Sequence, residues 1–310
     1  MSTGQHPAPA QAEVAGIASL AVRDLLHGPH LTGQVFAVVQ GMHIVAFPGA
    51  PREPRVIAIS APDAVRLPNA IIAGIPPGST EGIPAKATKP PKATKRADSP
   101  DSADAGGGWV RVGGLSVQAR RWWDPSPVFG PLSSDRLDQG AAVLSRVCRQ
   151  SLPGPALADH EGTRALAACC ANGDLAGAVE QAERLVGLGA GIVPAGDSVL
   201  CGLLLALRLL GGAIAGGGRA VWLADWLSAA VTSYASQRTT PLAASLLHCA
   251  ARGQAAAEAA AVLHGVAGED PVEPAARRLL TVSAAAALSA ADLAWGMVAG
   301  CRAAQALSVS

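Results

Sequence analysis

The stretch that decides the fold is "GLGAGIVPAGDSVLCGLLLALRLLG", residues 187–211. Glycines, a proline and an aspartate crowd into its first half, and a nearly continuous apolar run follows. The charge-free part of that run, from Ser198 to Leu207, is shorter than the roughly 20 apolar residues of a membrane-spanning helix, and Arg208 interrupts it. The pattern therefore predicts a glycine-rich loop that leads into a helix at the centre of a soluble helical bundle.

The glycines do not form a nucleotide-binding motif. They follow a predicted helix over 175–186, whereas the dinucleotide fingerprint requires a preceding strand. The lysine and hydroxyl pair of a phosphate-binding loop is also missing.

What remains is an anion site at the start of a buried helix. The first four N–H groups of a helix have no partner within it, and the helix dipole favours negative charge there. Gly189 and Gly191 leave the backbone open to a ligand, and the Asp197 carboxylate can accept hydrogen bonds from an amide. The alternative stays open that Asp197 only caps the helix and the glycines only turn the chain.

A second polar helix start lies in "SQRTTPLAASLLHCAARG", residues 236–253. Thr240 followed by Pro241 is typical of a helix N-cap and first helical residue. Arg238 and Thr239 add a guanidinium and a hydroxyl, which suit a carboxylate or a phosphate. The alternative is a well-capped surface helix. Two such starts in one apolar bundle favour a shared pocket.

The N-terminal part is rich in strand patterns. A helix is expected over Ala12–Leu26, followed by a hairpin that turns near Gln40-Gly41. Further strands are expected in "RVIAIS" (55–60), "NAIIAG" (69–74) and "WVRVGGLSVQARRWW" (109–123). Residues 76–108 hold almost no large apolar side chain, and we expect a disordered inserted linker there.

Helical patterns begin after "DPSPVFGP" and continue to the end of the chain. We predict an α+β fold with a β-rich N-terminal part, residues 12–75 with 109–130, packed on a larger α-helical bundle, residues 131–310.

Charge and cysteine content exclude several classes of partner. The 24 basic and 23 acidic residues nearly cancel, which argues against nucleic acid. The six cysteines form no CxxC pair and lie in apolar surroundings, so we expect buried thiols, no metal and no cofactor. Without a signal-peptide pattern or a membrane span, we expect a cytoplasmic protein.

Three stretches of the sequence together resemble the AllH-like family, named for a subunit of oxamate carbamoyltransferase. They are "GLGAGIVPAGDSVLCGLLLAL" (187–207), "RTTPLAASLLHCAARG" (238–253) and "LSAADLAWGMVAGCRAA" (288–304), and "RRWWDPSP" (120–127) resembles the junction after the family's β-rich region. The likeness covers roughly residues 15–75 and 109–305.

The resemblance implies a subunit that works with other proteins in allantoin and purine breakdown, where oxalurate and phosphate exchange with oxamate and carbamoyl phosphate. If this chain is an enzyme, it is then a carbamoyltransferase subunit, with a small carboxylate, carbamoyl or phosphate compound as ligand. The catalytic residues are unknown. By family position the resemblance assigns the ligand site to Gly189, Gly191, Pro194, Gly196, Asp197, Arg238, Thr239, Thr240 and Asp292.

The sequence also departs from the family pattern. Family members usually have Thr-Pro-Ser-Gly-Asp-Asp where this chain has Val193-Pro194-Ala195-Gly196-Asp197-Ser198. The third block, "AALSAAD" (286–292), keeps Ser289 and Asp292 but lacks the usual histidine and glycines. These losses leave a second hypothesis open, a non-catalytic ligand-binding or scaffolding protein with an eroded family pocket.

Overall fold

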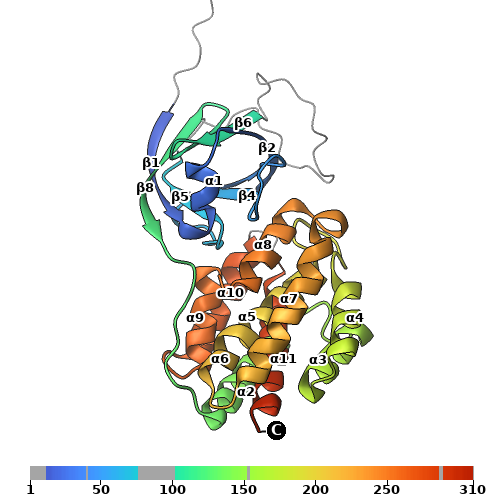
Figure 1. Ribbon diagram of the computed structural model, residues 1–310. Coiled ribbons are helices and arrows are strands. Elements are labelled where there is room, and N and C mark those ends of the chain that lie inside the picture. Colours follow the sequence, from blue (N-terminus) through green and yellow to red (C-terminus); the bar gives the residue numbers. More distant parts are fainter. Residues whose placement is uncertain (1–11, 40, 76–101, 152–153, 286–288, 310) are drawn as a thin grey trace, which may run out of the picture.

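The N-terminal part of the chain is a closed β-barrel (Figure 1). The computed structural model describes residues 12–39, 41–75, 102–151, 154–285 and 289–309. The barrel strands among them are β1 (Ala12–Ser19), β2 (Leu31–Val39), β3 (Met42–Ala46), β4 (Val56–Ser60), β5 (Ala70–Ala73), β6 (Ser102–Gly106), β7 (Trp109–Val112) and β8 (Leu115–Trp123). Their order is β1-β5-β4-β3-β2-β6-β7-β8, and the parallel pairing of β1 with β8 closes the barrel.

The barrel corrects the predicted fold class. The α+β description, with a β-rich part packed on a helical bundle, did not include a closed barrel, because two strands needed for closure were not recognised. Ala12–Ser19, expected within a helix, is β1, and only Leu20–His27 after it is helical, as η1 (Leu20–Val22) and α1 (Arg23–His27). Ser102–Gly106, expected within the disordered linker, is β6. The rest of the predicted linker, 76–101, lies outside the described residues.

Strand β1 shows why local pattern failed there. It lies between β5 and β8, and a Cβ at Gly16 would come within 2.7 Å of Ile71 Cγ2 and 2.8 Å of Val117 Cγ1. This close approach depends on residues far away in the sequence. Pairing on both sides therefore decides the conformation of β1 over its own propensity.

The other predicted strands are confirmed. Val39 pairs with Met42 in the β2–β3 hairpin, and Gly41 has a φ of 73°, which suits a tight turn. The expected strands at 55–60 and 69–74 are β4 and β5, and β7 and β8 occupy 109–123.

Strands β3 and β4 are buried on both faces. Val45 and Ile57 belong to the barrel interior. Ile44 and Val56, on the outer face, pack in a cluster that includes Leu242 from the helical part. This explains why both strands read as continuous apolar runs instead of alternating patterns.

The helical part lies below the barrel in Figure 1, with α8 nearest to it. Its elements are α2 (Ser134–Gln150), α3 (Glu161–Asn172), α4 (Leu175–Leu185), α5 (Ala195–Leu205), the π-helical turn η2 (Ala206–Leu210), α6 (Gly211–Ala213), α7 (Gly218–Arg238), α8 (Pro241–Ala251), α9 (Ala257–Val266), α10 (Val272–Ala285) and α11 (Ala290–Val309). The described residues after 133 are thus mainly helical, as the sequence pattern predicted.

Helix α5 is the centre of the bundle, because all of its residues are buried. It packs closely on α11 through glycines on both helices. A Cβ at Gly202 would collide with the Leu293 carbonyl, and one at Gly296 would collide with the Val199 carbonyl. The two backbones therefore touch where a side chain would normally separate them.

Residues Ala195–Ala213 form one helix of sufficient length and hydropathy to cross a membrane. However, 83% of its most apolar window is buried inside the protein. Burial in the bundle accounts for its apolar character.

The α5–α11 contact gives a test of this packing. Gly296→Ala should lower the free energy of unfolding by about 1–3 kcal/mol, because the added methyl group meets backbone that cannot rotate away. Gly218→Ala is the control, since nothing lies within 4 Å of a Cβ at that position. It should leave stability unchanged or raise it by up to ~1 kcal/mol. Urea unfolding followed by circular dichroism measures both, and equal midpoints would contradict the close packing.

Candidate functional site

The buried helix α5 begins as an incompletely paired helix terminus. Pro194 is its N-cap residue and makes no side-chain capping bond. The Gly196 N–H donates to the Leu188 carbonyl at 2.8 Å. Neither Ala195 nor Asp197 donates its own N–H to another group in the part of the chain that the structure describes. Gly189, with a φ of 110°, lies over the Ala195 nitrogen, and a Cβ at Gly189 would come within 3.0 Å of it.

The Asp197 side chain is fully buried and joins two segments. Its Oδ1 accepts the Gly187 N–H at 3.0 Å, and its Oδ2 accepts the Thr239 hydroxyl. Burial raises the pKa of Asp197 to about 6, while the bonds from Thr239 and Gly187 act in the opposite direction. Both carboxylate oxygens therefore have internal partners, and Asp197 connects the loop before α5 to the junction before α8.

The start of α8 has the predicted cap. Thr240 Oγ1 accepts the Ala243 N–H at 3.1 Å and donates to the Ile192 carbonyl at 2.6 Å, and Pro241 is the first helical residue. The starts of α5 and α8 thus lie close together.

The Arg238 side chain plays no part in this contact. It is exposed and forms no ion pair within the described part of the chain. The Arg238 carbonyl takes part in the contact, because it lies against Gly187. A Cβ at Gly187 would collide with this carbonyl oxygen.

The remaining predicted site residues have separate structural roles. Asp292 is buried and accepts the Leu157 N–H at 2.9 Å, so it holds the segment before α3. Burial also raises the pKa of Asp292. A Cβ at Gly196 would collide with the Leu185 carbonyl, whereas a Cβ at Gly191 would make only an ordinary contact, 3.8 Å from the Val193 carbonyl oxygen.

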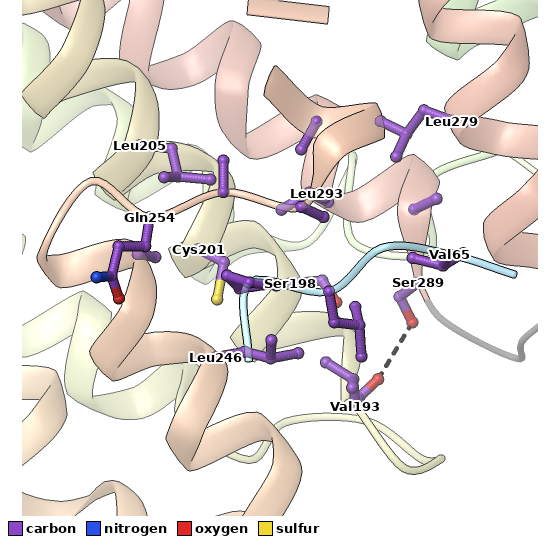
Figure 2. A pocket seen from close by; sticks show the side chains of 17 residues that line it. Val65, Val193, Ser198, Cys201, Leu205, Leu246, Gln254, Leu279, Ser289 and Leu293 are labelled. Atoms are coloured by element: carbon purple, nitrogen blue, oxygen red, sulfur yellow. Dashed lines mark hydrogen bonds between the residues drawn. The ribbon is translucent and has the colours of Figure 1, made fainter. Parts of the chain in front are cut away.

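A cavity of about 60 Å³ lies beside the start of α5. Figure 2 shows that α5, α8, the α8–α9 loop, the start of α11 and a barrel segment all contribute to it. Val193 and Ser198 line it from the α5 side, and Ser289 donates to the Val193 carbonyl at 3.4 Å. Almost all other lining groups are hydrocarbon.

A charged cluster at the junction of barrel and helices was missed from the sequence. Glu53 Oε2 accepts the Ser245 hydroxyl at 2.8 Å and the Arg55 N–H at 2.7 Å. Glu53 Oε1 lies 3.5 Å from Arg55 Nε, and the Arg252 guanidinium donates to the Glu53 carbonyl at 2.9 Å. Burial lowers the pKa of His248. The Glu53 carboxylate acts to raise this pKa, and the charges of Arg252 and Arg55 act to lower it further.

The sequence feature that could have indicated this cluster is a row of polar residues along one face of α8. Ser245, His248 and Arg252 follow each other at intervals of three and four residues, so they share one face of an otherwise apolar helix. Their partners Glu53 and Arg55 lie in the barrel part, and nothing in the local sequence connects them.

Two further cavities lie on either side of Glu53. One, of about 150 Å³, is lined by Glu53, Arg55, Ser236 and the first turn of α8. The other, of about 550 Å³, is lined by Glu53, Arg252 and Gln254 together with residues around α1. Within the described ranges, no group of three or more His, Cys, Asp or Glu side chains is placed to hold a metal ion.

Comparison with known proteins identifies one family. Residues 185–301 match the model of the family described as oxamate carbamoyltransferase subunit AllH. The match runs from the end of α4 into α11, so it includes the starts of α5 and α8 and leaves out the barrel. No curated protein and no solved structure matches the chain. The AllH-like resemblance is therefore confirmed for this helical segment.

The Asp197 contact predicts a pH-dependent stability. The folded-state pKa is about 6, above the ordinary value of 3.8, so the stability from its protonated form is present below about pH 4 and lost as pH rises through 6. From this residue alone the native protein should lose about 2.5 kcal/mol between pH 4 and pH 7.5. Asp197→Asn should remove that component. Urea unfolding of both proteins at the two pH values measures it, and parallel profiles would contradict the assignment.

Proposed function

We propose that this AllH-like chain is a subunit of a carbamoyltransferase-type complex that interconverts oxalurate and phosphate with oxamate and carbamoyl phosphate in allantoin and purine breakdown. In this proposal the chain binds the small carboxylate or carbamoyl compound at the starts of buried helices, and partner subunits complete the enzyme. The family description, a subunit of oxamate carbamoyltransferase, supports the assignment.

The observation that carries the proposal is the position of Arg55 at the start of α8. Arg55 lines the 150 Å³ cavity together with the first turn of α8, a helix that belongs to the family segment. A cation and the positive end of a helix dipole therefore face the same space. This cavity has room for roughly ten water-sized groups, the size class of oxamate and oxalurate.

The charges around this cavity suit a carboxylate. A guanidinium offers several N–H donors in a planar fork, and it binds carboxylate or phosphate through two of them. Glu53 faces only the Nε edge of Arg55, and within the described residues the terminal nitrogens have no partner. In this proposal those nitrogens bind the anionic end of the ligand, in the place that the sequence assigned to Arg238.

An exposed aromatic surface on α7 supports the need for partner proteins. Aromatic residues make up only 3% of the chain, yet Trp222, Trp226 and Tyr234 are each about half exposed on this one helix. Trp222 and Trp226 pack edge to face with ring centroids 6.1 Å apart. Exposed tryptophan and tyrosine at helical spacing are typical of protein–protein interfaces.

The second candidate is a non-catalytic ligand-binding or scaffolding subunit with the same fold. Val193 favours it, because this side chain packs in the apolar cluster between barrel and helices. The 60 Å³ cavity beside it is lined almost entirely by hydrocarbon, and the N-cap residue of α5, Pro194, makes no side-chain capping bond.

The transferase proposal predicts a specific effect of Arg55. In the assembly with the products of neighbouring genes, phosphate-dependent cleavage of oxalurate should occur. Arg55→Ala should lower kcat/KM about 10–100-fold, because a charge-assisted hydrogen bond to the substrate is lost. The control is Arg52→Ala, an exposed arginine with only a 3.8 Å contact to Asp24, which should keep the original rate.

Two results would contradict this proposal. If the complete assembly does not cleave oxalurate, the chain is not a transferase subunit. In that case, thermal stabilisation by oxamate or carbamoyl phosphate without turnover would support the second candidate. Full activity of Arg55→Ala would place the anion site elsewhere.

The aromatic surface gives an independent test of assembly. Trp222→Ser with Trp226→Ser should weaken association with the partner subunits at least about tenfold, because two large interface side chains are lost. Size-exclusion chromatography with light scattering measures the complex. Replacing Val128, which is 84% exposed, by Ser is the matched control. Equal association of all three proteins would exclude this surface as the interface.

A further inference from the structure

The cavity beside α5 contains a side-chain amide that lacks partners. Gln254, in the α8–α9 loop, lines the cavity, and its Oε1 is buried without a hydrogen-bond partner. Its amide nitrogen likewise makes no hydrogen bond within the described residues. Figure 2 shows Gln254 and Ser289 toward opposite ends of the cavity, so the Gln254 amide is well separated from the Ser289–Val193 hydrogen bond.

The backbone holds Gln254 in place. Its N–H donates to the Cys249 carbonyl at 2.9 Å, and the next residue, Ala255, donates to the Pro125 carbonyl at 2.9 Å. Gly253, with a φ of 74°, makes the turn that precedes it. An acceptor left unpaired at such a fixed place lowers the stability of the protein, and a ligand donor would remove that cost.

The lining of the cavity excludes a charged ligand. It includes no Lys, Arg, His, Asp or Glu side chain. Burial and the nearby Asp197 raise the pKa of the Cys201 thiol, so Cys201 is also neutral at pH 7. An ion entering this cavity would lose its hydration without gaining a counter-charge. An uncharged ligand does not have this cost.

We propose that this cavity binds a small uncharged primary amide that pairs with Gln254. The ligand N–H donates to Oε1 while the Gln254 amide N–H donates to the ligand carbonyl, so two hydrogen bonds form between matching groups. The short carbon chain of the ligand lies on Leu246 and Leu293. The volume admits roughly four to six water-sized groups, which corresponds to acetamide or propionamide.

This site is distinct from the one under the proposed function. It has no cation and lies on another face of α8, since Leu246 and Ala250 line it whereas Pro241 and Ala244 line the Arg55 cavity. Gln254 also lines the 550 Å³ cavity next to α1. Binding of the amide requires neither partner subunits nor turnover.

The test compares propionamide with propionate, which has the same shape and a negative charge. In the full-length Arg55→Ala protein, which lacks the carboxylate site of the proposed function, propionamide should raise the melting temperature and bind in titration calorimetry, and propionate should do neither. Gln254→Leu should weaken propionamide binding at least about tenfold, because both hydrogen bonds are lost. Arg55→Ala should bind propionamide as the native protein does, which separates this site from the proposed transferase site.

A second variant protects the test against misfolding. Gln254→Glu keeps the side-chain shape and replaces the amide N–H donor by a carboxylate, so it should also weaken propionamide binding. Circular dichroism establishes that each variant is folded. Equal binding of propionamide and propionate to Arg55→Ala, no binding of propionamide, or unchanged propionamide binding in a folded Gln254 variant would each overturn the proposal.

Discussion

The complete burial of α5 is the constraint on which the rest of the molecule depends. A helix covered on every side cannot leave its polar groups to water, so each must find a partner within the protein. Asp197 shows the result, since one carboxylate oxygen binds the loop before α5 and the other binds Thr239 before α8. The requirement to satisfy one buried carboxylate thus fixes the relative position of two helix starts.

The barrel and the helical part share one apolar cluster. The outer faces of β3 and β4 cover Val193 and Leu242, so neither part has a finished core without the other. The charged cluster lies at the edge of this contact, where Glu53 and Arg55 from the barrel meet Ser245 on α8. The Glu53 carboxylate binds both Arg55, in the barrel part, and Ser245, on α8, so it makes the relative placement of the two parts specific. The cavities next to Glu53 follow from that placement.

The features that the sequence predicted correctly depend on residues that lie close together in the chain. The loop before α5, the Thr240 cap and the β2–β3 turn at Gly41 are each specified by a few adjacent residues. The features that were missed depend on contacts between residues that are far apart in the chain. Strand β1 forms because β5 and β8 pair with it, and β6 looked like linker because its side chains are small. Arg55 illustrates the same limit, since this residue of the barrel part lies beside the start of α8, whereas the side chain of Arg238, adjacent to that start in the sequence, is exposed.

Closure of the barrel also determines the order in which the chain can fold. Ala12 pairs with Leu115 and Ser19 with Trp123, so β1 gains its parallel neighbour only after the last strand has been synthesised. Contacts between such distant segments form slowly, because a long stretch of chain must first be brought together. On the ribosome, β1 therefore emerges before the other described barrel strands, and one of its hydrogen-bonding edges stays open until β8 has followed.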